Sequence, residues 1–211
     1  MKLCERYQPR KLTEIVGQPV HLLRAFCRQP YPACWLFLGP PGVGKTATAY
    51  ALANELGCHD EFSGLHTVTA CDLSIDVARE MFQATLRLRP MEGSGWHVLV
   101  IEELDLLHEK VANYLKVALE RQLPAKCVVV ATSNSVEKLQ EALVERFTVV
   151  AYSGGSSLAS AVLPRLECIW REEYGDAPMP SGWERRGWDG ERFSVRRALD
   201  GLQRSALAAM A

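Results

Sequence analysis

A phosphate-binding pattern is the clearest chemical signal in the chain. Residues 39–46 read Gly-Pro-Pro-Gly-Val-Gly-Lys-Thr, a complete G-x-x-x-x-G-K-[ST], directly after the apolar run Trp35–Leu38 and before a helical pattern. Glycines let backbone N–H groups turn toward a β-phosphate, and the helix N-terminus adds positive potential. Lys45 is expected to reach the β- and γ-phosphates, and the Thr46 hydroxyl to bind Mg²⁺. A Gly-Pro turn with an incidental lysine is the alternative. The expected nucleotide-contacting residues are Pro40, Pro41, Gly42, Val43, Gly44, Lys45, Thr46 and Ala47.

Two acids follow a second apolar run, as a triphosphate site requires. Val98–Ile101 has the character of a strand, and Glu102 and Glu103 come directly after it. We expect Glu102 to hold Mg²⁺ through the water shell of the ion, and Glu103 to orient and polarise an attacking water molecule. Acids at an isolated strand end are more often solvated surface, but the phosphate-binding pattern favours the functional interpretation.

The elements that must position these residues alternate between strands and helices. Three apolar runs have the length and continuity of strands buried on both faces: Cys34–Leu38, Val98–Ile101 and Cys127–Thr132. Apolar residues at helical spacing fill three further segments: Lys45–Leu56, Ile75–Leu88 and Lys110–Arg121. This alternation predicts an α/β fold with a mostly parallel sheet flanked by helices, and the pattern of residues 39–46 indicates the P-loop NTPase type of that fold.

A second, smaller unit is expected after the linker-like sequence Ser153–Ser157. Leu158–Glu173 and Ser194–Met210 have helical patterns, and Pro164 either kinks the first helix or begins its regular part. Pro178–Gly190 is rich in Pro, Gly and Trp and predicts an irregular connection. We therefore predict an α/β nucleotide-binding domain over residues 1–152 and a small all-helical lid domain over residues 153–211.

Composition excludes several classes of protein. With 211 residues, 48% hydrophobic and 23% charged, the chain has the composition of a globular protein and not of a disordered one. A formal net charge of −1 argues against a globally basic nucleic-acid binder. The apolar runs are far shorter than the roughly 18 residues of a membrane helix, and seven scattered cysteines form no C-x-x-C. These features favour a cytoplasmic protein with reduced thiols and no membrane partner.

With these features the sequence resembles the AAA+ ATPases, and among them the small subunits of replication factor C and related sliding-clamp loaders. Glu5–Leu12 and Ile15–Gln18 are similar to the opening segment that wraps the adenine in that family, and further similar segments are Thr69–Asp72, Ile75–Arg79 and Leu115–Glu120. The resemblance covers roughly residues 3–204. It implies ATP and Mg²⁺ as ligands and adds four nucleotide-contacting residues: Tyr7, Pro9, Val16 and Gly17.

The resemblance also implies three catalytic roles. Val128–Asn134 looks like the sensor strand, whose terminal residue, here Asn134, contacts the γ-phosphate or the attacking water. Val195–Asp200 is similar to the lid helix whose first arginine, here Arg196, senses the γ-phosphate. Arg146 stands where clamp loaders place an arginine finger that acts on the neighbouring subunit, although a surface arginine is the alternative. A finger implies a homo- or hetero-oligomer of such subunits.

Several positions depart from the family pattern. Glu102 replaces the usual aspartate, which could slow hydrolysis, while Asp105 keeps the family spacing and supports Glu102 over Glu103 as the magnesium residue. Gln8 replaces an arginine and Leu3 a tryptophan. Ser194 could serve only as the N-cap of the last helix. The third, collar domain of clamp loaders is expected to be missing from this chain.

The function predicted on this basis is an ATPase that controls a DNA replication or repair assembly, with DNA and a sliding clamp as partners. Ser74–Arg79 and Lys116 lie where loaders contact DNA, although such residues are usually solvated surface. Two alternatives stay open. One is an ATP-gated structural subunit with little hydrolysis, and the other is a different AAA+ machine, such as a Holliday-junction motor or a protein remodeller.

Overall fold

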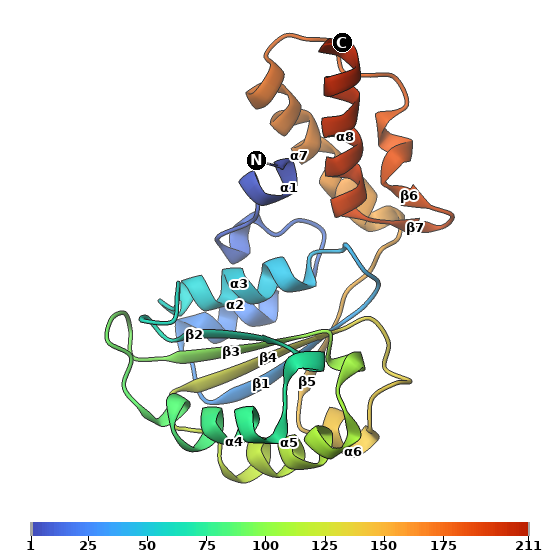
Figure 1. Ribbon diagram of the computed structural model, residues 1–211. Helices are drawn as coiled ribbons and strands as arrows, with labels where there is room; N and C mark the ends of the chain where they lie inside the picture. Colours follow the sequence, from blue (N-terminus) through green and yellow to red (C-terminus); the bar gives the residue numbers. More distant parts are fainter. Residues whose placement is uncertain (1, 211) are drawn as a thin grey trace.

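Five parallel strands form the centre of the protein (Figure 1). The structure is a computed structural model that describes residues 2–210. In their order across the sheet, the strands are β2 (Leu65–Thr69), β3 (His97–Glu102), β4 (Cys127–Ser133), β1 (Ala33–Leu38) and β5 (Thr148–Ala151). The three strands expected from apolar runs are confirmed, and β2 and β5 flank them.

Helices cover both faces of the sheet (Figure 1). Along β4, Val128 and Val130 point into one apolar cluster and Val129 and Ala131 into the other, because side chains alternate along a strand. One cluster includes residues of α2 (His21–Arg28) and α3 (Lys45–Glu55). Three helices cover the other face: α4 (Ile75–Gln83), α5 (Glu109–Arg121) and α6 (Glu141–Val144). Short 3₁₀ turns connect these elements: η1 (Leu12–Glu14), η2 (Ala70–Asp72), η3 (Thr85–Arg87) and η4 (Leu104–Leu106).

The helix expected over Ile75–Leu88 is shorter than predicted. α4 ends at Gln83, where the Arg87 side chain donates a hydrogen bond to the Phe82 carbonyl at 3.1 Å. The chain then turns into η3, which buries Leu86 and leaves Leu88 68% exposed. The apolar pattern extends past the end of α4 because Leu86, in the following turn η3, is also buried.

The C-terminal part forms the helical lid. Its long helices are α7 (Ser156–Tyr174) and α8 (Val195–Met210), as expected, and Pro164 lies inside α7 and does not begin it. The predicted irregular connection contains η5 (Trp183–Gly187) and a short antiparallel hairpin of β6 (Trp188–Asp189) and β7 (Arg192–Phe193). The division of the chain between residues 152 and 153 stays a prediction.

The N-terminal helix α1 (Leu3–Arg6) packs against α8 and lies beside the lid (Figure 1). Leu3 is buried in the same apolar cluster as Leu202 and Ile169. Within residues 2–210, no helix is long and apolar enough to cross a membrane.

Candidate nucleotide-binding site

Strand register brings the predicted phosphate-binding residues to one edge of the sheet. Leu38 at the end of β1 lies opposite Ser133 of β4, and Ile101 of β3 lies opposite Ala131 of β4. The segments that follow these three strands therefore meet at their carboxyl ends. They carry the glycine-rich loop after β1, Asn134 after β4 and Glu103 after β3.

The glycine-rich loop needs its glycines for backbone shape and for close approach. Gly42 and Gly44 have φ angles of 77° and 101°, in the left-handed region that side chains disfavour. A Cβ atom at Gly42 would also overlap the Ser194 hydroxyl of the lid. The Val195 N–H donates a hydrogen bond to the Gly42 carbonyl at 2.9 Å. The loop is thus fixed between α3 and the start of α8.

Lys45 is the charged group at the centre of this edge. Its side-chain Nζ donates to the carbonyls of Gly39 at 2.6 Å and Pro40 at 2.8 Å, and to Asn134 Oδ1 at 2.9 Å. The Asn134 N–H in turn donates to Asp105 Oδ1 at 3.1 Å. The Lys45 pKa is lowered to about 8, chiefly by burial and to a smaller extent by the Arg196 charge, while the Asp105 and Glu103 carboxylates oppose this shift. Lys45 and Asn134 are therefore in direct contact, and their roles toward a phosphate stay predictions.

Glu103 adopts an unusual backbone conformation at the end of β3. It has a φ of 56°, and among the described residues it is the one non-glycine residue with positive φ. Its N–H donates to the Thr132 hydroxyl of the neighbouring strand at 3.2 Å. The side chain is exposed and lines the cavity beside Asn134. Strained conformations of this kind often occur at functional sites, because the surrounding structure must hold them.

Glu102 lies on the α3 side of the sheet and does not line the cavity. Its Oε1 atom accepts a hydrogen bond from the Tyr50 hydroxyl at 3.0 Å. Tyr50 follows Thr46 by four residues in α3, so both side chains lie on the same face of that helix. Burial, together with the nearby Glu102 carboxylate, raises the Tyr50 pKa to about 12. Glu102 and Thr46 are thus on the same side of α3.

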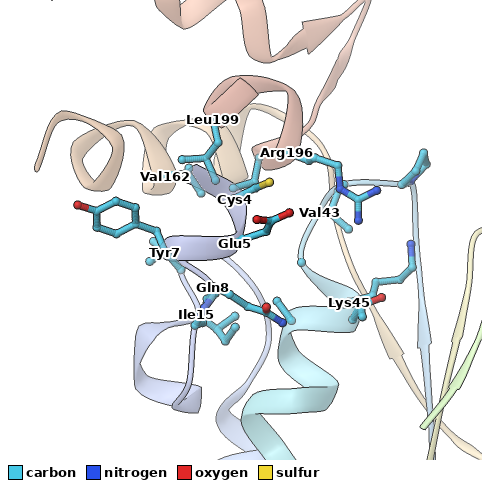
Figure 2. Close-up of a pocket in the computed structure, with 18 of the residues that line it drawn as sticks. Cys4, Glu5, Tyr7, Gln8, Ile15, Val43, Lys45, Val162, Arg196 and Leu199 are labelled. Carbon is cyan, nitrogen blue, oxygen red and sulfur yellow. The ribbon is translucent and has the colours of Figure 1, made fainter. Parts of the chain in front are cut away.

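The lid supplies Arg196, the second residue of α8. Its side chain lines the cavity near Val43, and Figure 2 shows Val43, Lys45 and Arg196 on the same side of that cavity. The Ser194 hydroxyl accepts a hydrogen bond from the Arg197 N–H at 3.3 Å, so Ser194 caps α8. The cap sets where α8 begins and therefore where Arg196 projects.

A cavity of about 600 Å³ extends from the phosphate loop to the lid (Figure 2). Its far wall comes from separate elements: α1, the segment after η1, α7 and α8. The apolar residues there are Cys4, Tyr7, Ile15, Val16, Val162, Leu166, Ile169 and Leu199, and polar or charged groups come from Lys2, Glu5, Gln8, Glu14, Arg165 and Asp200. A phosphate loop joined to a pocket with apolar side chains suits a ligand with phosphates at one end and a flat base at the other.

Most predicted site residues line this cavity. Those on its surface are Tyr7, Pro9, Val16, Pro41, Gly42, Val43, Gly44, Lys45, Thr46, Ala47, Glu103, Asn134 and Arg196. Gly17 and Pro40 lie outside the lining, although Pro40 contributes the carbonyl that Lys45 contacts. Sequence reasoning missed the lid wall, because Val162, Leu166, Ile169 and Leu199 look like ordinary helix-core residues. It also missed Glu5, a carboxylate of α1 that faces the cavity (Figure 2).

Arg146 is separate from the cavity of its own chain. It follows α6, and its Nη2 atom donates to Glu120 Oε2 of α5 at 3.0 Å. Glu145 Oε2 lies 3.9 Å from Arg146 Nη1, and the Arg146 side chain is 33% exposed. Arg146 therefore does not contribute to the cavity of the chain that carries it.

The sequence of this chain matches one protein family and is similar to several known proteins. The family described as "ATPase family associated with various cellular activities (AAA)" matches residues 35–154. The replication factor C small subunit of Methanocella arvoryzae is 30% identical, over 97% of this chain and 63% of that protein. Replication factor C subunit 3 of Saccharomyces cerevisiae is 32% identical, over 68% of this chain and 43% of that protein. The chain spans less than two thirds of the length of these relatives.

Solved structures show the same fold. The RuvB Holliday junction branch migration motor of Thermotoga maritima superposes with a TM-score of 0.70 at 22% identity, covering 97% of this chain and 67% of that one. A variant of the same motor gives a TM-score of 0.72 at 20% identity, with the same coverage. At this level of identity the likeness concerns the fold alone.

Proposed function

The chain belongs to the AAA family of ATPases, and from this premise we propose that it binds ATP with Mg²⁺ and hydrolyses ATP where two subunits of an oligomer meet. The cycle would control a DNA replication or repair assembly, as in a clamp loader.

The contact between Lys45 and Asn134 is the observation that carries the proposal. The two residues are 89 positions apart, yet their side chains meet at 2.9 Å at the carboxyl ends of adjacent strands. A γ-phosphate held by Lys45 would therefore lie within reach of Asn134. Glu103 lines the same cavity, where it would orient the attacking water as general base. Arg196 would add positive charge from the lid side.

The donor set fits a magnesium ion. A threonine hydroxyl and carboxylate oxygens are hard oxygen ligands, which Mg²⁺ prefers. Thr46 lines the cavity, and Glu102 is held on the same side of α3 by Tyr50. We propose that Thr46 and Glu102 hold the ion, which would neutralise charge on the phosphates when it is bound.

We propose that Arg146 acts on the nucleotide of a neighbouring subunit. Its position outside the cavity of its own chain supports this role. A guanidinium at the γ-phosphate would stabilise the charge of the transition state, an effect of about 10³–10⁵ in rate in other phosphoryl-transfer enzymes. A single chain would then hydrolyse ATP slowly.

Mixing two inactive variants tests this function. Arg146→Ala subunits keep an intact cavity but lack the finger, whereas Lys45→Ala subunits bind nucleotide weakly but keep the finger. A mixture should recover part of the ATPase rate, because a subunit of each kind can form one complete site. Arg121→Ala, a change at an exposed arginine at the end of α5, is the matched control and should retain the wild-type rate. Unchanged ATPase activity in Arg146→Ala alone would contradict the finger assignment.

We propose DNA and a sliding clamp as partners. The relatives are named replication factor C subunits, which supports a role in replication on DNA, whereas the sliding clamp is proposed from the family resemblance alone. Stimulation of ATP turnover by primer–template DNA would support the loader proposal. Stimulation by branched DNA alone would instead support a motor of the RuvB type, whose fold this chain shares.

A second candidate function is an ATP-gated structural subunit with little turnover. The hydrogen bond from Tyr50 to Glu102 favours this candidate, because it engages the carboxylate that would hold Mg²⁺. Glu102 also replaces the aspartate of the family pattern. Tight ATP binding with negligible hydrolysis under all DNA conditions would support this candidate.

A further inference from the structure

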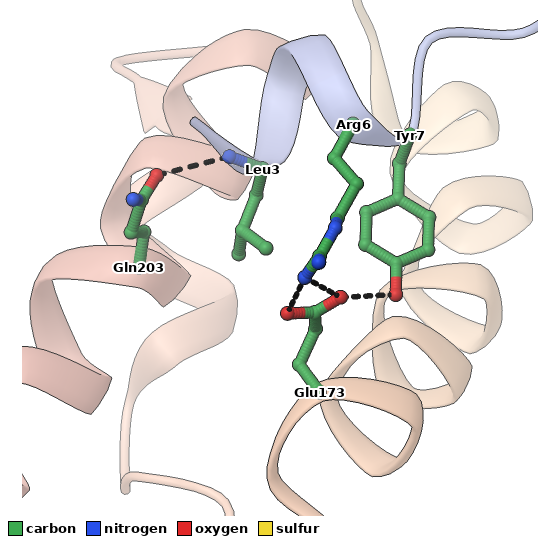
Figure 3. A network of polar contacts seen from close by, with 5 residues as sticks. All are labelled: Leu3, Arg6, Tyr7, Glu173 and Gln203. Carbon is green, nitrogen blue, oxygen red and sulfur yellow. Dashed lines mark hydrogen bonds and ion pairs between the residues drawn. The ribbon is translucent and has the colours of Figure 1, made fainter. Parts of the chain in front are cut away.

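The N-terminal segment Lys2–Tyr7 is bound to the lid, although it precedes the α/β core in the sequence. The Leu3 N–H donates to Gln203 Oε1 of α8 at 3.0 Å, and the Leu3 side chain is only 4% exposed. Arg6 Nη1 contacts both carboxylate oxygens of Glu173 in α7, at 2.8 and 2.5 Å. The Tyr7 hydroxyl donates to Glu173 Oε1 at 2.6 Å. Figure 3 shows these contacts between α1 and the two lid helices.

Glu173 is the central group of this network. Its side chain is 15% exposed, whereas that of its partner Arg6 is 55% exposed. A carboxylate shielded to this degree must be paired and hydrogen-bonded, and Arg6 and Tyr7 together satisfy that need. Burial, followed by the contact with Glu173, raises the pKa of Tyr7, so its hydroxyl stays protonated as a donor. The Arg165 guanidinium lies over the Tyr7 ring, 5.8 Å from its centroid.

The next segment of chain is bound to the α/β core instead. The Leu12 N–H donates to Glu55 Oε1 of α3 at 2.8 Å, and Leu12 is fully buried. The Arg10 carbonyl accepts a hydrogen bond from Asn54 of α3 at 3.3 Å. The attachment of the chain thus changes from lid to core between Tyr7 and Arg10.

Both attached segments line the same cavity. Cys4 and Tyr7 face it from the lid-bound segment, together with Val162 and Leu199 of the lid, whereas Ile15 faces it from the core-bound segment. A helix of four residues has no stability of its own in water, so the position of α1 depends on its anchors. Glu173 holds the last turn of that helix.

We propose that Glu173 is a positioning residue for nucleotide binding. It fixes Lys2–Tyr7 to the lid, so that the lid-side part of the base wall is a single unit built from α1, α7 and α8. The inference rests on the proposed function, because it assigns this wall to the base of ATP. Glu173 itself is not among the residues that line the cavity, so it acts through Tyr7 and Arg6.

The test compares the binding of ATP with that of inorganic pyrophosphate, which lacks base and ribose. Glu173→Ala should lower ATP affinity about tenfold, since hydrogen bonds to a charged group are of that order, and should leave pyrophosphate affinity unchanged. Glu173→Gln keeps an acceptor for the Tyr7 hydroxyl and should stay within about threefold of wild type. Glu167→Ala, at an exposed acid of the same helix, is the matched control and should bind both ligands as wild type does.

Amide hydrogen exchange without ligand gives an independent readout of the tether. In Glu173→Ala, the Arg6 and Tyr7 amides should exchange faster, because they bond to Lys2 and Leu3 carbonyls of the released segment, while α3 amides stay unchanged. Unchanged exchange would overturn the proposal. So would unchanged ATP affinity, an equal loss of pyrophosphate affinity, or a Glu173→Gln variant as weak as Glu173→Ala. A folded wild-type chain that binds neither ligand would overturn the proposed function and with it the nucleotide role of Glu173; the exchange data would still report separately whether Glu173 holds the segment.

Discussion

The two ends of the cavity are built in different ways. At the phosphate end, the loop after β1, Glu103 after β3 and Asn134 after β4 follow adjacent strands of one sheet, and backbone hydrogen bonds fix their spacing. At the base end, the wall comes from α1, α7 and α8, which meet through side chains such as Tyr7 and Glu173, and from the core-bound segment after η1 that carries Ile15.

This difference in construction suggests different roles for the phosphate end and the base end of the cavity. Lys45, Glu103 and Asn134 lie in segments that follow buried strands of the sheet, so their geometry is rigid. Most residues of the base wall belong to α1 or to the lid, whose contacts with the core include the Val195 hydrogen bond to Gly42. We infer that the phosphate end sets catalysis and that the base end sets how firmly the nucleotide holds the lid.

The largest expected effect is at the phosphate end. Glu103→Gln removes the proposed general base, and we expect the ATPase rate to fall about 10²–10⁴-fold. ATP affinity should change little, because the amide keeps the shape of the side chain. Steady-state turnover and equilibrium binding measure the two quantities. Glu109→Gln, at an exposed acid at the start of α5, is the control; an equal loss of turnover in both variants would contradict the assignment.

A second change at the phosphate end should weaken the binding of ligands with and without a base. Lys45→Ala is expected to weaken ATP and pyrophosphate alike by about 30- to 100-fold, since charge-assisted hydrogen bonds contribute roughly 2–3 kcal/mol. Calorimetric titration with each ligand measures this loss. The exposed Lys126→Ala is the matched control. If Lys45→Ala weakened only ATP, the assignment of the phosphate end would be wrong.

At the base end, Ile15→Ala should give a smaller and selective loss. It removes apolar carbons from a half-buried wall residue, and at ~0.8 kcal/mol per buried carbon we expect ATP affinity to fall about five- to tenfold. Pyrophosphate affinity should be unaffected. Leu22→Ala, at a residue that is 51% exposed, controls for general loss of apolar surface. Equal weakening of both ligands would remove the distinction between the two ends.

The smallest expected effect lies far from both ends, at the start of β2 and β3. His66 Nε2 is 2.9 Å from His97 Nδ1, and His97 Nε2 is 2.6 Å from the Leu88 carbonyl, so His97 Nε2 carries the proton and His97 Nδ1 accepts from His66. Burial, and then the neighbouring His97, lower the His66 pKa below 6.5, whereas Glu61 opposes this shift. The unfolded chain therefore binds more protons just below pH 6.5, and the free energy of unfolding should fall as the solution is acidified.

His66→Gln keeps the donor to His97 and should flatten that acid slope by about 1 kcal/mol or less between pH 6.5 and 5. Denaturant unfolding at several pH values measures it, with the exposed His21→Gln as control. ATP affinity at neutral pH should not change. A slope identical to wild type would show that His66 does not titrate differently in the folded chain.

The sequence predicted the phosphate end far better than the base end. The glycine-rich loop is a local pattern, and the apolar runs of β1, β3 and β4 bring Lys45, Glu103 and Asn134 together by strand order alone. The base wall depends on contacts such as that between Tyr7 and Glu173, 166 residues apart, and neither residue type suggests the pairing.

The end of α4 shows the same limit on a local scale. The helical pattern extended to Leu88, but the Arg87 side chain bonds to the Phe82 carbonyl and the chain turns after Gln83. The pattern of apolar residues does not encode a hydrogen bond between a polar side chain and the end of the helix, so it could not predict where α4 ends.

The most direct test of the central claim is a calorimetric titration of the full chain with a slowly hydrolysed ATP analogue and Mg²⁺. We expect one bound nucleotide per chain for the wild type and binding about 30- to 100-fold weaker in Lys45→Ala, with the variant folded by circular dichroism. A folded wild-type chain that binds no nucleotide, or a Lys45→Ala variant that binds it equally well, would contradict nucleotide binding at this site.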